Sequence, residues 1–62
     1  MAGIMNKTLV ELRAEADRLC KMLPEEDQYR FDAYLEQFWN DKASLIEACF
    51  DMQAEIIENR RS

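Results

Sequence analysis

Residues 35–45, LEQFWNDKASL, decide the fold of this chain, because they either continue one helix or separate two. Asn40 and Asp41 are weak helix formers that favour caps and turns. The flanking apolar positions nevertheless keep the alternating spacing of four and three residues that marks one helical seam. This seam runs through Phe31, Leu35, Phe38, Lys42, Leu45, Cys49, Met52 and Ile56. Because its phase is unbroken, the sequence predicts one continuous helix over about 24–60. The alternative is a three-helix bundle with a turn at Asn40-Asp41.

A shorter helix is predicted over about 8–23. Thr8 followed by Glu11 is typical of a capping box, in which each side chain bonds the backbone N–H of the other residue. Pro24 should end this helix and begin the next, because proline suits a first helical turn but not an interior one. The apolar positions between them, again three and four residues apart, are Leu9, Leu12, Ala16, Leu19 and Leu23.

The predicted fold class is therefore an all-α helical hairpin, forming a single small helical domain over 1–62 with residues 1–6 disordered. A chain of this size buries only about 60% of its unfolded surface, so a second copy would stabilise it. The long helix also carries a second apolar stripe, through Trp39, Ile46, Phe50 and Ile57, which predicts that two hairpins pair into a dimeric four-helix bundle. The core and the dimer seam are expected at Leu9, Leu12, Leu19, Leu23, Phe31, Leu35, Phe38, Leu45, Ile46, Cys49, Phe50, Met52, Ile56 and Ile57.

Composition argues against several classes of protein and site. With 48% hydrophobic and 34% charged residues, the chain is typical of neither a disordered nor a membrane-spanning protein. The absence of histidine removes the usual acid–base catalyst and a zinc ligand, and one glycine is too few for a phosphate-binding loop. We therefore expect a non-enzymatic protein with no catalytic residue, no cofactor and no metal.

The charge of the chain is negative and unevenly distributed. Thirteen acidic residues against eight basic ones give −5, and the excess lies in residues 24–62. A negative chain repels phosphates, so direct nucleic-acid binding is not expected. On a continuous helix, the carboxylates of Glu36, Glu47, Asp51, Glu55 and Glu58 would share one face. Such a face is either an ordinary solvated surface or a nucleic-acid mimic that inhibits a DNA- or RNA-binding protein.

Aromatic residues form the other distinctive group, because four of them fall within residues 31–39. Those at the edge of a seam are typical interface anchors. We therefore expect Arg30, Tyr34 and Trp39 to contact a partner protein. The leading functional hypothesis is a small regulatory or adaptor protein that acts by protein–protein binding. The nucleic-acid mimic is the alternative, and a structural subunit of a helical assembly is a third possibility.

The location of the protein is inferred from its first residues and its cysteines. Residues 1–5, MAGIM, contain neither the basic nor the apolar segment of an export signal. Cys20 and Cys49 lie within amphipathic patterns, where reduced cysteine behaves as a small apolar residue. Both observations favour a cytoplasmic protein without a membrane partner. Its size and composition suit an accessory protein of a bacterium or phage.

Overall fold

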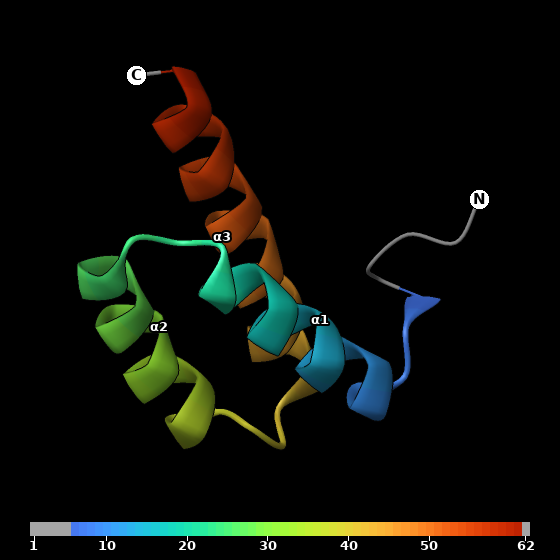
Figure 1. Cartoon of the computed structure of the whole chain (residues 1–62). Helices are drawn as coiled ribbons and strands as arrows, with labels where there is room; N and C mark the ends of the chain where they lie inside the picture. Colours follow the sequence, from blue (N-terminus) through green and yellow to red (C-terminus); the bar gives the residue numbers. More distant parts are fainter. Residues whose placement is uncertain (1–5, 62) are drawn as a thin grey trace.

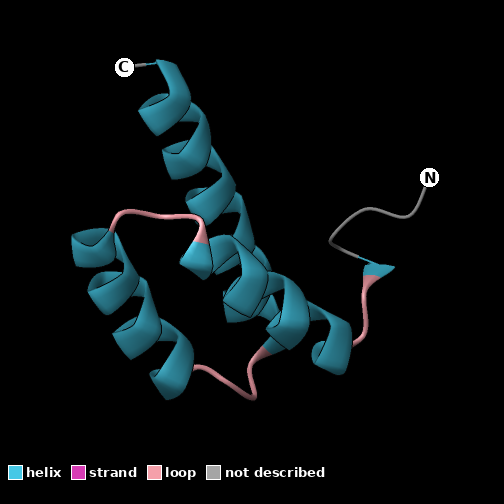
Figure 2. Cartoon of the chain, viewed as in Figure 1, coloured by secondary structure: helices cyan, strands magenta, loops and turns pink. Residues whose placement is uncertain are grey.

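The computed structural model describes residues 6–61, and this part of the chain is helical with no strand (Figures 1 and 2). Three helices follow one another: α1 (Leu9–Lys21), α2 (Glu25–Gln37) and α3 (Lys42–Arg61). The all-α prediction is confirmed. The disorder expected for residues 1–6 falls on residues 1–5, which lie outside the described residues, and on Asn6, which is exposed.

The beginning of α1 confirms the predicted capping box. The Thr8 backbone N–H donates to Glu11 Oε1 at 2.9 Å, and the Glu11 N–H donates to Thr8 Oγ1 at 3.2 Å. These bonds satisfy two backbone donors that a helix N-terminus leaves without partners. The helix ends before Pro24, whose carbonyl accepts the N–H groups of Asp27 and Gln28 at the start of α2. Both predicted boundaries therefore follow from local chemistry.

The prediction of one continuous helix over 24–60 is wrong, and the alternative with a turn at Asn40-Asp41 is observed. The last bond of α2 joins the Phe38 N–H to the Tyr34 carbonyl at 3.0 Å. Asp41 then caps the start of α3: its side chain accepts the Ser44 N–H at 3.3 Å, and its carbonyl accepts the Leu45 N–H at 3.0 Å. The N-cap preference of aspartate prevails here over the seam's regular phase.

Arg13 of α1 supports this turn from a distance of 26 residues along the chain. Its Nε donates to the Trp39 carbonyl at 2.9 Å, and its Nη2 donates to Asn40 Oδ1. The guanidinium also lies over the Trp39 ring, with Cζ 5.5 Å from the centroid. A turn exposes carbonyls that a continuous helix would bond internally, and Arg13 supplies a donor for one of them, the Trp39 carbonyl. The heptad spacing could not show the break, because it describes positions along one helix and not a contact made by another helix.

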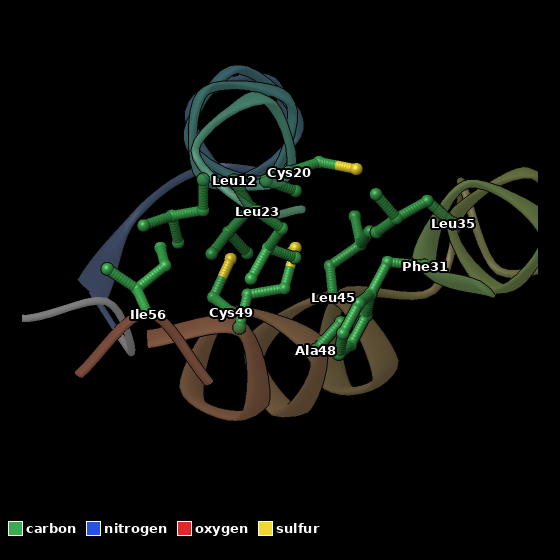
Figure 3. Close-up of a cluster of buried hydrophobic side chains, with 12 residues drawn as sticks. Leu12, Cys20, Leu23, Phe31, Leu35, Leu45, Ala48, Cys49 and Ile56 are labelled. Carbon is green, nitrogen blue, oxygen red and sulfur yellow. The ribbon is translucent and has the colours of Figure 1, made fainter. Parts of the chain in front are cut away.

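The hydrophobic core lies where α1 crosses α3, with α2 closing one side (Figures 1 and 3). Side chains from all three helices point toward one another there (Figure 3). The buried residues are Leu12, Ala16, Leu19, Cys20, Leu23, Phe31, Leu35, Leu45, Ala48, Cys49, Met52 and Ile56. Leu9 and Ile46 pack partly buried against them, and Phe38 is half-buried.

Two positions show where the predicted seam fails. Lys42 begins α3 and is exposed, so it does not continue the seam between Phe38 and Leu45. Phe38 instead packs beside Tyr34, with ring centroids 4.7 Å apart and ring planes at 45°. α2 contacts α3 much less than α1 does. This loose packing leaves a groove between α2 and α3.

Candidate functional site

A groove of about 430 Å³ lies between α2 and α3. It exists because the two helices are joined by a short turn yet pack closely only against α1. Its lining residues are Arg30, Phe31 and Tyr34 from α2, and Glu47, Ala48, Asp51, Ala54 and Glu55 from α3. The groove therefore combines members of two predicted sets, the partner-binding residues and the acidic face.

The apolar part of the groove is formed by two ring systems and two small side chains. Phe31 and Ala48 are buried, whereas Tyr34 is half-buried and Ala54 is exposed. Alanines opposite the rings of Phe31 and Tyr34 leave a hollow that a larger side chain would fill. A hollow with an aromatic side is a typical place for an apolar anchor of a partner protein.

The charged part of the groove is mostly acidic. Glu47, Asp51 and Glu55 contribute three carboxylates, against the single guanidinium of Arg30. Arg30 Nη2 lies 3.7 Å from Glu55 Oε1 and equally 3.7 Å from Asp27 Oδ1. Its Cζ is 4.9 Å from the centroid of the Phe31 ring. Arg30 therefore spans the groove from α2 to α3 and covers part of its apolar side.

The three predicted partner-binding residues do not lie together. Arg30 and Tyr34 line the groove, but Trp39 does not. Trp39 belongs to the turn between α2 and α3, where Arg13 binds its carbonyl and covers its ring. Its side chain is 38% exposed. The structure thus places Trp39 in the contact that holds the turn.

The predicted acidic face is divided, because it assumed a continuous helix. Glu47, Asp51 and Glu55 lie along the groove on α3. Glu36 is exposed on α2 and does not line the groove, and Glu58 is exposed near the end of α3. The groove therefore concentrates only the middle of the predicted set.

Part of the predicted dimer seam remains uncovered on another side of α3. Phe50 and Ile57 are 51% and 57% exposed, and Ile46 is half-buried. A shallow depression of about 200 Å³ lies beside this surface, where the end of α1 meets α3. Its lining residues are Arg18, Leu19, Met22, Gln53, Ile56, Ile57 and Arg60. Core formation thus accounts for the main seam and leaves the second stripe exposed.

Both cysteines are free, buried thiols. Burial raises the pKa of Cys20 to about 11, helped by the nearby Asp32 carboxylate, whose Oδ1 lies 3.4 Å from Sγ. Burial also raises the pKa of Cys49, and the charge of Glu15 adds to this effect. A thiol with a raised pKa is a poor nucleophile at neutral pH, because the thiolate is the reactive form.

Sequence reasoning missed Arg13, Ala48 and Ala54. Arg13 is one of four bases within residues 7–21, and nothing in its spacing indicates a bond to residues 39 and 40. The two alanines have a detectable signal, because they alternate with the carboxylates of Glu47 and Asp51 on one side of α3. The packing of α2 beside α3 shows that these residues line a groove.

Within residues 6–61, no group of three or more His, Cys, Asp or Glu side chains is arranged to hold a metal ion. No helix among the described residues is both long enough and apolar enough to cross a membrane. Comparison with protein-family models, curated proteins and solved structures finds no match for this chain.

Proposed function

We propose that this protein is a small non-enzymatic adaptor that binds a segment of another protein in the groove between α2 and α3. One observation carries the proposal: the groove joins an apolar hollow to a row of carboxylates on the same surface. Protein partners bind to such surfaces through an apolar anchor, while charged groups at the edge select orientation and partner. A groove between two helices also suits a helical partner segment.

The three groups with a shifted pKa, Glu11 and the two thiols, are not tuned for acid–base catalysis. Thr8 lowers the pKa of Glu11 through the capping box, and burial raises the pKa of both thiols. These shifts move the pKa of each group further from neutral pH, whereas acid–base catalysis needs a pKa near the working pH. We therefore assign none of these three groups a catalytic role.

The nucleic-acid mimic is not proposed. It was expected from carboxylates on one face of a single helix from Glu36 to Glu58, and the turn at 38–41 separates Glu36 from the four carboxylates on α3. Three of these carboxylates lie along an apolar hollow. A phosphate backbone has no apolar surface of this kind, so the groove is a poor imitation of one. The groove therefore favours a protein partner.

Self-association remains a prediction, and the exposed stripe of α3 is where we propose that it occurs. Ile46, Phe50 and Ile57 share this stripe with Gln53, and none of the four is ionisable. Pairing the stripe with the same stripe of a second copy would bury apolar surface without bringing like charges together. Because this stripe is separate from the groove, a dimer would leave both grooves open.

The test of the groove fills it with a larger side chain. Ala54 lines the groove and is exposed, so Ala54→Leu should occupy the hollow without disturbing the core. Ala43→Leu is the matched control, since Ala43 is also exposed on α3 and does not line the groove. We expect Ala54→Leu to weaken binding of the partner purified from the native host at least tenfold. Ala43→Leu should leave the dissociation constant unchanged.

Isothermal titration with the purified partner measures both variants, and circular dichroism verifies that each keeps its helix content. Equal affinities for the wild type and Ala54→Leu would show that the groove is not the binding site.

A further inference from the structure

We infer that the partner segment is cationic, and that its arginine or lysine replaces Arg30 at Glu55 when the groove is occupied. The inference rests on the proposed binding function of the groove and names the chemistry of the partner. Arg30 is then a specificity-determining residue, because it pairs with Glu55 in the free protein and a basic residue of the partner displaces it.

The charge balance of the groove selects a cation. Three carboxylates face one guanidinium, so the lining has a net charge of −2. The side-chain carboxylates of Glu47 and Asp51 have no hydrogen bond or ion pair with another described residue. An acidic or phosphorylated segment would be repelled here, whereas a basic segment would find carboxylates without partners.

The contacts of Arg30 show that a guanidinium fits this groove. Its charged end approaches Glu55, and its plane lies near the Phe31 ring. Arginine combines a carboxylate contact with an aromatic contact in this way, because its flat group stacks on rings. An incoming arginine would require the same two surfaces. Arg30 therefore competes directly with the partner.

The same contacts show that Arg30 can leave. The separation of 3.7 Å from Glu55 exceeds hydrogen-bond length, and the side chains of Arg30 and Glu55 are 61% and 42% exposed. Exposed pairs of this kind hold weakly. Asp27, one helical turn earlier on α2, lies equally close to Arg30 and would keep it paired after Glu55 is released. The exchange therefore leaves neither Arg30 nor Glu55 without a charged partner.

The spacing of the carboxylates describes the partner segment further. Glu47, Asp51 and Glu55 are four residues apart, so they lie about 6 Å apart along one ridge of α3. A partner helix with basic residues at the same interval, and apolar residues beside them, would match both the ridge and the hollow. The fitting partner is thus a basic amphipathic helix.

The experiment uses a synthetic 18-residue amphipathic peptide with a leucine face and three lysines spaced four residues apart. A second peptide with glutamine in place of the lysines is the matched probe. Arg30→Met removes the competing cation and retains an apolar stem, and we expect it to strengthen binding of the lysine peptide roughly two- to fivefold. Arg60→Met is the control, because it changes net charge equally and Arg60 does not line the groove.

Fluorescence anisotropy measures the affinities, and methyl shifts of Ala48 and Ala54 show whether the peptide occupies the groove. Glu55→Gln should weaken the lysine peptide and leave the glutamine peptide unaffected. An affinity gain that is equal in Arg30→Met and Arg60→Met would overturn the role of Arg30. Failure of the lysine peptide to bind better than the glutamine peptide would overturn the cationic partner. Neither result affects the Ala54→Leu test, which decides the proposed function separately.

Discussion

At the scale of single residues, small side chains shape the groove as much as charged ones do. Ala48 is almost fully buried beneath the groove, and Ala54 is exposed at its edge. Larger side chains at these positions would close the space beside Phe31 and Tyr34. The carboxylates of α3 then determine which partner can use the space.

Burial separates the residues that stabilise the fold from those that are available for binding. Leu45 is completely buried, so Leu45→Ala should lower the free energy of unfolding by about 2–5 kcal/mol. Glu47 is exposed on the same helix, and Glu47→Ala should change it by no more than about 0.5 kcal/mol. Urea denaturation followed by circular dichroism measures both. A larger loss for Glu47→Ala would reverse the assignment of inner and outer faces.

The buried thiol of Cys20 predicts a pH dependence of stability at alkaline pH. The folded protein holds this proton until the pKa of about 11, whereas an exposed thiol loses it near 9. Above pH 9 the unfolded chain therefore binds fewer protons, so the stability contributed by Cys20 is fully present below pH 9 and falls as pH rises toward 11. Thermal melts between pH 9 and pH 11 should show the melting temperature of the wild type falling more steeply with pH than that of Cys20→Ala.

Alkylation by iodoacetamide provides the second measurement for Cys20. We expect slow modification of the folded protein at pH 8, since little thiolate is present, and rapid modification in urea. Fast alkylation of the folded chain at pH 8 would contradict the raised pKa.

At the scale of elements, the turn between α2 and α3 depends on two different kinds of interaction. Asp41 provides a local cap for α3, and Arg13 binds the turn from another helix. A cap can be recognised from its residue type, but a long-range donor cannot. The regular spacing from Phe31 to Ile56 predicted a continuous helix because it described apolar faces without describing this contact.

The cap predicts a measurable cost of substitution. Asp41→Ala should lower stability by about 1 kcal/mol, because the Ser44 N–H loses its acceptor. Glu36→Ala is the matched control, since Glu36 is an exposed carboxylate near the end of α2. Chemical denaturation compares the two variants. NMR Cα shifts should also return toward coil values across 38–41, and uninterrupted helical shifts there would restore the continuous helix.

At the scale of the whole molecule, α3 presents three faces. One packs against α1 in the core, one lines the groove with α2, and one remains exposed through Phe50 and Ile57. At 100° per residue their centres are roughly 120° apart. Partner binding and self-association therefore use different sides of the same helix.

The exposed face predicts a dimer in solution. Sedimentation equilibrium at micromolar concentration should give twice the chain mass of 7.4 kDa, and Phe50→Glu should restore the monomer by placing a charge in the paired stripe. Tyr29→Glu is the matched control, because Tyr29 is 72% exposed on α2, away from the stripe. A wild-type monomer whose melting temperature does not change on dilution would exclude the dimer.

The helical class, the capping box at Thr8, the break at Pro24 and nearly all the buried positions can be predicted from the amino-acid sequence alone. Each of these depends on residues within one or two helical turns, or on a periodicity that survives without knowledge of neighbours. The sequence also indicated Arg30, Tyr34 and the carboxylates of α3 as surface features.

The packing of the three helices was needed to show that Asn40-Asp41 is a turn and that Trp39 belongs to it. The same packing shows that Arg30 and Tyr34 face Glu55 across a groove. These outcomes depend on contacts between residues 25 or more positions apart, such as Arg13 with Trp39 and Arg30 with Glu55. A periodic pattern shows which side of a helix is apolar, but the packing of the other helices determines which side is covered.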